Sequence, residues 1–469
     1  MSIRREPDFA PEFTIPVLVI GAGACGLSAA LAAKETGADV LVLERDATPA
    51  GSTAMSYGGI CAAGTAAQAR AGIEDNPAAL EQDILAITHN QTDPALAHTV
   101  AVNAAPALDW LTETLAFPLD VEIGWTGFGH RVPRLHMPPG RSGSSLMGMF
   151  LNAAENAGID ILTQAKVSEL IVDDRDRILG VRAERPGGSE EIGCEQLILA
   201  SCGYGGDSDL IRRYMPELAN AKYYGHEGNQ GDALKWGQAL GAAVADLGAY
   251  QSLGSLTEPS SLVMPHILMI GGGVQINARG ERFEDELDDI SGQALTILEQ
   301  PGGVCWIVYD EGLHDEARGR FDEYRDGESI NAYHAAHNWQ DLAASIGVPP
   351  DALRQTMESV EALKRDGGTD QFGRRFSPKD ALKPPYYAVK VTGALFHTQG
   401  GLCIDDQARV VREDGTPFPN LYAGGGAARS VSGPKNWGYL PGMGLCTAVA
   451  LGRLAGIRAA VAASVPEPA

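Results

Sequence analysis

The stretch of sequence that decides the fold is residues 14–46, which read TIPVLVIGAGACGLSAALAAKETGADVLVLERD. Its β-branched run, Ile15–Ile20, predicts a buried parallel strand that leads directly into a glycine-rich turn. Ala and Leu residues at helical spacing predict a helix over Leu27–Lys34, and Val40–Leu43 predicts a second strand that ends at Glu44. The order of strand, turn, helix and strand is that of a dinucleotide-binding βαβ unit.

The turn carries the GxGxxG pattern, and each of its glycines has a physical role. Gly21 permits the tight turn, Gly23 lets a pyrophosphate reach the backbone, and Gly26 lets the helix pack on the strand. The phosphates would lie at the positive end of the helix, and Glu44 follows where a carboxylate accepts hydrogen bonds from ribose hydroxyls. The cofactor contacts predicted in this unit are Gly21, Ala22, Gly23, Ala24, Gly26, Glu44 and Arg45.

The segment after the second strand favours FAD over NAD. Residues 51–59 read GSTAMSYGG, and such small hydroxyl residues and paired glycines suit a loop against the pyrophosphate and the flavin ring. An ordinary surface loop is the alternative interpretation. The chain has a single GxGxxG and no second Rossmann unit for a nicotinamide, so direct use of NAD(P)H is not expected. The contacts predicted in this loop are Gly51, Ser52, Thr53, Gly58 and Gly59.

Length and composition limit the classes of protein that remain. The chain has 469 residues, more than one hydrophobic core usually organises, so two structural domains are expected. Its formal net charge of -24 argues against a nucleic-acid partner. The 7 cysteines form no CxxC pair, which argues against a metal site and indicates reduced thiols. Residues 1–16 lack the apolar core of a secretory signal, and no uninterrupted apolar stretch reaches the roughly 18 residues of a membrane span. We therefore expect a cytoplasmic protein.

Taken together, these segments resemble the flavoprotein family of fumarate reductases, succinate dehydrogenases, urocanate reductases and 3-ketosteroid dehydrogenases. The resemblance runs from about Pro16 to Ala460. After the glycine turn and residues 51–59, its landmarks are His136–Gly140, Ala165–Val167, Leu197–Tyr204, Gly231–Ala233, Gly280–Glu286, His397–Gly401 and Leu421–Gly426.

The resemblance implies an α/β fold in which a Rossmann-type FAD-binding domain is interrupted by a smaller α+β capping (substrate) domain. The expected boundaries are 1–239 and 384–469 for the FAD-binding domain and 240–383 for the capping domain. It also implies further FAD contacts at Val167, Gly425, Gly442, Gly444 and Leu445. In the respiratory members a histidine holds FAD covalently; Ser52 occupies that position here, so non-covalent FAD is expected. Gly426 replaces the usual Glu of the LYAAGE segment.

Within the expected capping domain, the pattern predicts a strand over Trp306–Tyr309 and a helix over Ser345–Leu363. The helix would place Leu353, Met357, Val360 and Leu363 in the core. The acidic run Glu284–Asp289 is interpreted as a solvated face, with Arg282 as a structural ion-pair partner.

The family's dicarboxylate reductases use several cations to pair two carboxylates, and most of those positions are changed here. One expected arginine falls at Ile290, another falls around Tyr439, and an expected histidine is replaced by Leu253. His397 is retained. Fumarate and succinate are therefore poor candidate substrates.

Residues 438–444, GYLPGMG, resemble the Tyr-Pro-Gly segment of ketosteroid dehydrogenases, although Leu440 separates the Tyr from the Pro. In that branch the tyrosine hydroxyl and a nearby backbone N–H bind the carbonyl oxygen as an enolate develops. The candidate catalytic residues are Tyr439, His397 and Tyr57. Their alternatives are packing over the flavin edge for Tyr439 and a backbone-bonded structural role for His397. His136 is interpreted as a loop residue that fixes the 140–145 turn.

These features predict an FAD-dependent oxidoreductase acting on CH–CH bonds α,β to a carbonyl. The favoured reaction dehydrogenates a cyclic ketone, ketosteroid-like or smaller, by α-proton abstraction and β-hydride transfer to flavin N5. The alternative is an enoate or enone reductase of the fumarate or urocanate type, and a third possibility is a flavin-binding subunit or sensor without catalysis. The expected partners are a small carbonyl substrate and an external electron acceptor or donor: a quinone, a carrier protein or oxygen.

Overall fold

A computed structural model describes residues 2–464, and they form two compact units. The first comprises the chain up to Pro216, Gly225–Tyr250 and the chain from His397 onward. The second comprises Glu217–Tyr224 and Gln251–Phe396. The predicted α/β fold class is confirmed. The predicted domain boundaries at 240 and 384 stay a prediction; the compact units change at 251 and 397.

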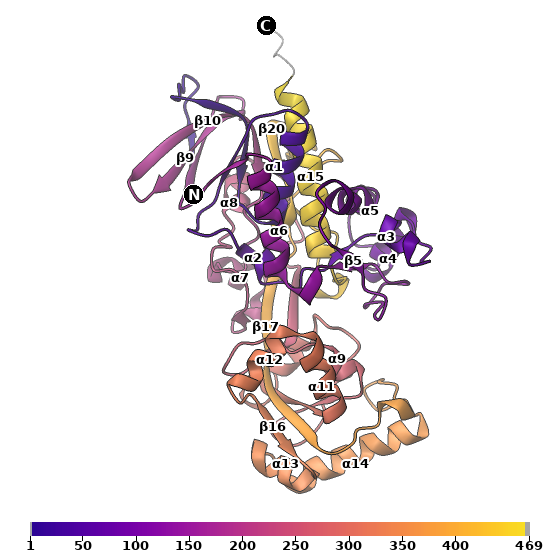
Figure 1. Cartoon of the computed structure of the whole chain (residues 1–469). Helices are drawn as coiled ribbons and strands as arrows, with labels where there is room; N and C mark the ends of the chain where they lie inside the picture. The colour runs from indigo at the N-terminus through magenta and orange to yellow at the C-terminus, as the bar shows by residue number, and fades with distance from the viewer. Residues whose placement is uncertain (1, 465–469) are drawn as a thin grey trace. The chain divides into compact units, whose positions relative to one another are not determined.

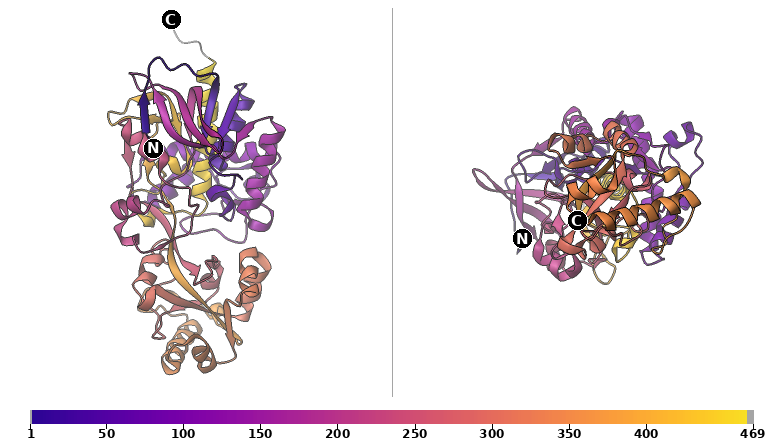
Figure 2. Two further views of the ribbon diagram at one scale, coloured as in Figure 1. Left: turned by 90° about the vertical axis from the view of Figure 1, so that its left-hand side faces the viewer. Right: turned by 90° about the horizontal axis from the view of Figure 1, so that it is seen from below.

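A nine-stranded mixed sheet forms the centre of the first unit (Figures 1 and 2). Its main path is β1 (Ser2–Arg5), β8 (Lys166–Val172), β9 (Ile178–Arg185), β10 (Gly188–Leu199), β2 (Thr14–Ile20), β3 (Val40–Leu43) and β7 (Asp160–Leu162). β20 (Pro417–Ala423) pairs with β10 and with β19 (Arg409–Val411). β2 runs parallel to β3 and β10, as the βαβ pattern predicts, whereas β9 is antiparallel to β8 and β10.

Two apolar helices, α1 (Ala24–Glu35) and α15 (Met443–Ala463), pack side by side against this sheet (Figure 1). Glycines make the approach possible: a Cβ on Gly452 would lie 2.3 Å from the Cys25 carbonyl oxygen, and one on Gly456 2.1 Å from that of Ala29. In the described chain α15 alone is long and apolar enough to cross a membrane, and 67% of its most apolar window is buried. This burial is typical of an apolar helix in a protein core.

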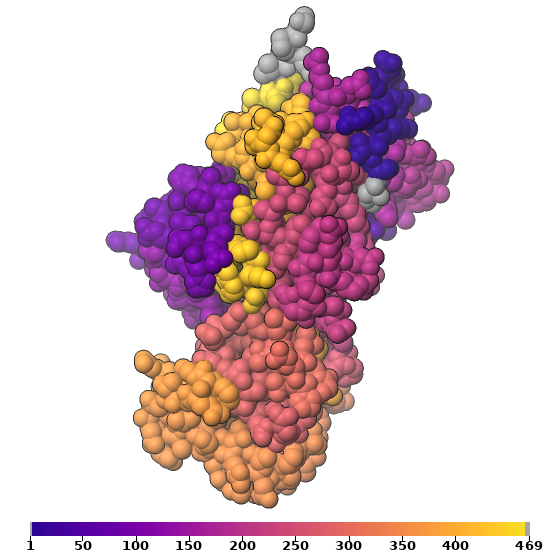
Figure 3. Space-filling view, turned by 180° about the vertical axis from the view of Figure 1, so that it is seen from behind, coloured from indigo at the N-terminus to yellow at the C-terminus, as the bar shows by residue number. Residues whose placement is uncertain are grey.

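The first unit contains further helices and several short strands. The helices are α2 (Gly51–Ala54), α3 (Ala66–Arg70), α4 (Pro77–Ile87), α5 (Pro94–Asp109), which continues into a π turn at Trp110–Thr114, α6 (Gly143–Asn156), α7 (Ser208–Tyr214) and α8 (Asp232–Ala239). β4 (Ile60–Cys61), β5 (Asp120–Val121) and β6 (Leu135–Met137) form a small sheet, and β12 (Val244–Ala245) pairs with β18 (Gly401–Leu402). In Figure 3 the purple surface of the α3–α5 region lies beside yellow surface of the C-terminal part. The His89 ring, just after α4, lies 4.9 Å from the Trp437 ring.

The second unit is an α+β structure around a six-stranded sheet. Its strands are β11 (Lys222–Tyr223), β13 (Tyr250–Thr257), β14 (Val274–Ile276), β15 (Val304–Asp310), β16 (Tyr333–Ala336) and β17 (Tyr386–Thr398). Its helices are α9 (Ile267–Ile270), α10 (Gln293–Leu298), α11 (Glu311–Arg320), α12 (Asp322–Ser329), α13 (Trp339–Ile346) and α14 (Pro350–Asp366). The strand predicted at Trp306–Tyr309 is confirmed within β15.

The single helix predicted over Ser345–Leu363 is wrong, because two helices occupy this stretch. α13 ends at Ile346, where Gly347 adopts the left-handed conformation with φ +73. α14 starts at Pro350, whose missing N–H is harmless in the first turn of a helix. The predicted core positions hold: Leu353, Met357 and Val360 are buried, and Leu363 packs half-buried against them.

The solvated face predicted for Glu284–Asp289 is also wrong at its centre. The Glu286 side chain is fully buried and accepts hydrogen bonds from Arg282 and Arg374, at 2.6 and 2.7 Å. Arg282 is the predicted ion-pair partner and also pairs with Asp370. Burial raises the pKa of Glu284 to about 8.

Candidate functional site

The turn between β2 and α1 has the geometry that its sequence predicts. Gly21 has φ +106, and a Cβ there would lie 2.5 Å from the Ala200 carbonyl oxygen. A Cβ on Gly26 would lie 1.8 Å from the Gly21 carbonyl oxygen, so the first turn of α1 closes directly over the loop. The Ala22 N–H donates to Glu44 at 2.9 Å, which ties the turn to the end of β3. Both glycines are therefore required by close backbone approaches.

Replacing Gly26 by alanine is expected to weaken FAD binding about tenfold or more, because the new methyl group would overlap the Gly21 carbonyl oxygen and displace the turn. The measurement is the flavin-to-protein absorbance ratio after purification and dialysis. Gly148→Ala in α6 is the matched control, since a Cβ there meets nothing within 4 Å. Equal flavin content in the two variants would contradict this prediction.

The 51–59 loop lies against the turn, where it was predicted to bind the cofactor. Thr53 Oγ1 accepts a hydrogen bond from the Ala24 N–H at 3.0 Å and lies 3.4 Å from the Cβ position of Gly23. Ser52 Oγ accepts from Asn229 Nδ2 at 2.9 Å, a contact that sequence reasoning missed.

The glycines of this loop allow its close packing. Gly51 and Gly58 have φ +53 and +76, and the Cβ positions of Gly58 and Gly59 fall 2.7 Å from Pro138 and Met137. The loop residues Gly51, Ser52, Thr53, Gly58 and Gly59 thus form one wall beside the β2–α1 turn.

The residues predicted for the adenosine half lie at the ends of β3 and β8. Glu44 is 9% exposed, and its two oxygens accept from the N–H groups of Ala22 and Asp46, both at 2.9 Å. Each carboxylate oxygen keeps a lone pair that can accept from a ribose hydroxyl. Arg45 donates to the Gly228 carbonyl at 2.6 Å. Val167 is buried in the core, so only its backbone can reach a ligand.

Two buried polar atoms in this region indicate that the residues fit a dinucleotide. Within residues 2–464, Ser201 Oγ, next to Gly21, and Asp232 Oδ1, next to Arg45, have no hydrogen-bond partner. Buried polar atoms normally have partners, and a ligand rich in hydroxyls and phosphates would supply them. A shallow, open depression of about 350 Å³ adjoins this end, lined by Arg45, Asp46, Ala47, Gln164, Lys166, Glu184, Arg185 and Pro186.

The C-terminal glycines lie near the same helix ends. Gly425, with φ +56, backs onto Cys25 of α1, where its Cβ position is 3.1 Å from the Cys25 Cβ. Gly442, with φ +80, is the N-cap of α15, and Gly444 and Leu445 form the first turn of that helix. The resemblance thus implied FAD contacts at residues that the structure places around the N-termini of α1 and α15.

Tyr439 and His397 come together beside the start of α15. Their rings lie 6.3 Å apart edge to face, and the Cβ position of Gly444 is 3.6 Å from His397 Nε2. Burial raises the pKa of Tyr439 to about 12, although a hydrogen bond from the Gly442 N–H opposes the shift. Burial lowers the pKa of His397 to about 4, against a hydrogen bond to the Thr398 backbone. At neutral pH both side chains are therefore uncharged. Tyr57, the third candidate, is half-buried between Ser56 and Gly58 in the 51–59 wall.

The interpretation of His136 as a loop residue is wrong, because it belongs to strand β6. Its Nε2 lies 2.9 Å from Thr65 Oγ1, and its Nδ1 lies 2.9 Å from the Arg134 carbonyl oxygen. A side chain satisfied on both nitrogens in a small sheet is structural. Burial lowers its pKa from 6.5 to about 4.

The depressed pKa of His136 makes stability fall in acid. Between pH 6.5 and about 4 the unfolded chain binds the proton and the folded chain does not, so stability rises with pH across this window. The shift corresponds to about 3 kcal/mol, present above pH 6.5 and lost as the pH falls towards 4. Urea unfolding at several pH values should show a shallower pH dependence for His136→Gln than for the natural chain. Parallel curves for the two proteins would contradict this prediction.

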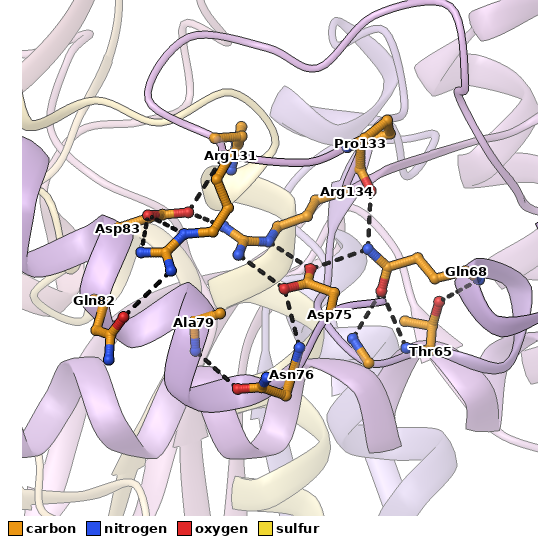
Figure 4. Close-up of polar contacts among 12 residues, drawn as sticks. Thr65, Gln68, Asp75, Asn76, Ala79, Gln82, Asp83, Arg131, Pro133 and Arg134 are labelled. Atoms are coloured by element: carbon orange, nitrogen blue, oxygen red, sulfur yellow. Dashed lines mark hydrogen bonds and ion pairs between the residues drawn. The ribbon is translucent and has the colours of Figure 1, made fainter. Parts of the chain in front are cut away.

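A buried ion-pair network that sequence reasoning missed holds the loop before β6 (Figure 4). Arg134, with a fully buried side chain, donates to Asp75 at 2.7 and 2.9 Å and to Asp83 at 2.6 Å. Arg131 donates to Asp83 at 2.8 Å from the more exposed side. Gln68 donates to Asp75 at 3.0 Å and to the Pro133 carbonyl at 2.8 Å. The positive charges of Arg131 and Arg134 are thus neutralised by Asp83 of α4 and by Asp75 in the segment before it.

No group of three or more His, Cys, Asp or Glu that could hold a metal ion occurs in residues 2–464. All 7 cysteines are free thiols.

Comparison with known proteins identifies relatives over nearly the whole chain. The probable fumarate reductase of Shewanella frigidimarina (strain NCIMB 400) is 30% identical over 461 residues, 98% of this chain and 77% of that protein. The 4-oxocyclohex-2-ene-1-carboxylate 5-dehydrogenase of Sinomonas cyclohexanicum is 28% identical over 372 residues, 70% of this chain and 61% of that protein.

Solved structures show the same similarity over nearly the whole chain. The open conformation of a flavocytochrome c3 fumarate reductase matches with a TM-score of 0.84 and 30% identity, covering 97% of this chain and 80% of that chain. The 3-ketosteroid-Δ4-(5α)-dehydrogenase of Rhodococcus jostii RHA1 has a TM-score of 0.76 at 24% identity, covering 97% and 99% of the two chains, which shows a shared fold.

Residues 16–442 match the FAD binding domain family, and this range includes both the glycine turn and Tyr439. The predicted membership of the fumarate reductase flavoprotein group and the predicted cofactor, FAD, are confirmed. The chain belongs to the FAD binding domain family and is an FAD-dependent oxidoreductase.

Proposed function

We propose that this oxidoreductase acts on a CH–CH bond α,β to a carbonyl group and dehydrogenates a cyclic ketone, ketosteroid-like or smaller, to the enone. The observation that carries the proposal is the hydrogen-bonded pair formed by the Tyr439 hydroxyl and the Gly442 N–H at the start of α15. A phenol that accepts from a backbone N–H keeps its own hydrogen free to donate, which suits a carbonyl oxygen that gains charge during reaction. FAD, when bound, supplies the two-electron oxidation of the substrate.

The protonation state of Tyr439 supports its use as a donor. With a pKa raised to about 12, the phenol keeps its proton at neutral pH and can donate a hydrogen bond to an enolate oxygen. The N-terminus of the 21-residue helix α15 adds a positive potential at the same place. Together these groups stabilise negative charge on the substrate oxygen without a buried cation.

The charges of the nearby side chains also favour a ketone over a dicarboxylate as the substrate. His397 is neutral at pH 7 because its pKa is about 4, so it offers no positive charge to a carboxylate. Arg282, in the 280–286 segment that resembles the reductases, is already paired with Glu286 and Asp370 and has a side chain 6% exposed. The relative named as a dehydrogenase of a cyclohexenone carboxylate supports a small cyclic ketone as the substrate class.

The alternative is an enoate or enone reductase of the fumarate or urocanate type. The observation that favours it is the 30% identity to a probable fumarate reductase over 98% of the chain.

The two functions are tested by anaerobic titration of the purified holoprotein, followed by the visible absorbance of the flavin. The probes are cyclohexanone, 4-oxocyclohexanecarboxylate and a saturated 3-oxosteroid, then fumarate, urocanate and cyclohexenone after chemical reduction. Bleaching by a saturated ketone, with the enone formed in equal amount, is the expected result. Reoxidation by fumarate or urocanate without any bleaching by ketones would establish the reductase instead. Flavin that no probe reduces or reoxidises would favour a non-catalytic subunit or sensor.

We further propose that FAD is held non-covalently, because Ser52 lacks the imidazole that the covalent members use. Acid precipitation should then release all the flavin into the supernatant. The proposed electron partner is a quinone, a carrier protein or oxygen. The free thiols support a reducing location such as the cytoplasm.

A further inference from the structure

His130 makes a single directed contact with the turn that carries the proposed donors. Its Nε2 lies 3.0 Å from the Pro441 carbonyl oxygen, and the residue is 7% exposed. A carbonyl oxygen can only accept, so Nε2 carries the hydrogen. The other ring nitrogen, Nδ1, is buried and has no hydrogen-bond partner among the described residues. Burial lowers the pKa of His130, which keeps the ring neutral with its hydrogen on Nε2.

Neighbouring residues hold the positions on either side of Pro441. Gly129, with φ +72, would place a Cβ 2.5 Å from Leu440 Cδ2, so only glycine allows the His130 loop to approach this closely. The Gly442 carbonyl accepts from the Cys61 N–H at 3.3 Å, and the Cβ position of Gly442 lies 2.3 Å from Leu135. Three successive residues, 440–442, are therefore each fixed by the segment that contains β4, the His130 loop and β6.

The His130 loop is itself anchored by the buried ion pairs of Figure 4. Arg131 and Arg134 follow His130 closely in the chain, and both bind Asp83. Arg134 also binds Asp75 through two hydrogen bonds. The loop that carries the His130 imidazole is thus held in place by hydrogen bonds from Arg131 and Arg134 to Asp83 of α4 and to Asp75.

The geometry of the peptide bond transmits this contact to the donor. The Pro441 carbonyl and the Gly442 N–H belong to one planar peptide group, in which they point in opposite directions because the bond is trans. Fixing the oxygen on the His130 side therefore aims the N–H to the other side, where it donates to the Tyr439 hydroxyl. A hydrogen bond to the carbonyl also polarises the amide and strengthens its N–H as a donor.

We propose that His130 is a positioning residue: through the Pro441–Gly442 peptide it orients the amide N–H that donates to the Tyr439 hydroxyl, and so aims that hydroxyl at the substrate oxygen. The use of the Tyr439 hydroxyl on a substrate rests on the function proposed above, whereas the positioning of the peptide does not.

The test compares His130→Met with His130→Gln, two side chains of similar length. Gln has an amide N–H close to the place of Nε2, and Met has no donor. Two readouts on the holoproteins are needed: hydrogen–deuterium exchange of peptides covering residues 438–446, and kcat and KM for the ketone that bleaches the flavin. We expect His130→Met to speed exchange in this segment about tenfold and to lower kcat about tenfold or more, with KM changed little. His130→Gln should stay within about threefold of the natural protein in both readouts.

The outcomes separate the two proposals. Faster exchange in His130→Met and its rescue by Gln support the positioning role even if no ketone reacts, in which case the proposed function alone fails. Equal exchange and equal kcat in the two variants would overturn the inference. A similar loss in both variants, with rapid exchange across the whole chain, would assign His130 to general packing and would also overturn it.

Discussion

Replacing Arg134 by methionine is expected to lower the free energy of unfolding by about 3–5 kcal/mol, the largest stability effect of any single polar substitution considered for this chain. The Arg134 side chain is fully buried, and the side chains of its partners Asp75 and Asp83 are 1% and 9% exposed. Burial alone would raise the pKa of Asp83, but its hydrogen bonds to Arg131 and Arg134 hold the pKa below the usual value. Without Arg134, Asp75 loses both of its hydrogen bonds from a cation and remains buried. The measurement is denaturant unfolding of the holoprotein followed by circular dichroism.

Arg131→Met is the matched control, since it removes a guanidinium from the same Asp83. The Arg131 side chain is 46% exposed, so this variant should cost less than about 1 kcal/mol. Adding Asp75→Asn and Asp83→Asn to Arg134→Met should recover part of the loss, because no buried charge is then unpaired. Equal losses in Arg131→Met and Arg134→Met would show that water or rearranged neighbours compensate for the missing charge.

The βαβ unit could be predicted from sequence because its determinants are local. The strand β2, the turn and the helix α1 lie within about 20 residues, and each glycine of the turn is required by a contact inside that stretch or with the neighbouring strand. Gly26, whose Cβ position falls 1.8 Å from the Gly21 carbonyl oxygen, is the clearest example. The sequence pattern and the backbone geometry therefore both identify the same βαβ unit.

The prediction of one helix over Ser345–Leu363 was wrong because the helical spacing of apolar residues continues across the break between α13 and α14. Both α13 and α14 pack apolar residues on the same core, including Ile346 and Leu353, so the apolar pattern alone does not reveal two helices. The Gly347 and Pro350 positions did carry the signal, as a left-handed C-cap and a first-turn proline.

The polar networks could not be predicted, because their partners lie far apart in the chain. Arg134 binds carboxylates 51 and 59 residues earlier, and Glu286 binds Arg374, 88 residues later. The sequence analysis therefore interpreted Glu286 as part of a solvated face and did not detect the network around Arg134. His130 was missed for the same reason, since its partner Pro441 is 311 residues away.

Replacing Tyr439 by phenylalanine is expected to lower kcat for the ketone about 100- to 1,000-fold, the size of effect seen when one oxyanion donor is removed. The ring stays, so packing beside His397 and the binding of FAD should change little. Because the donor acts most strongly on charge that develops during reaction, KM should change less than kcat. The measurement is steady-state turnover of the ketone that bleaches the flavin, with flavin content recorded for each preparation.

Tyr309→Phe is the control, because it also removes a buried phenol hydroxyl, one that lies 2.7 Å from the Tyr324 hydroxyl inside the second unit. It should leave kcat within about twofold of the natural protein, since surface and core changes away from the reacting atoms mainly affect stability. If Tyr439→Phe keeps full activity towards the ketone, the Tyr439–Gly442 pair is not the carbonyl site. If the variant keeps full activity towards fumarate or urocanate while the ketone is inert, the uncharged turn has no part in the reaction. A carboxylate site built on cations elsewhere then becomes the better explanation.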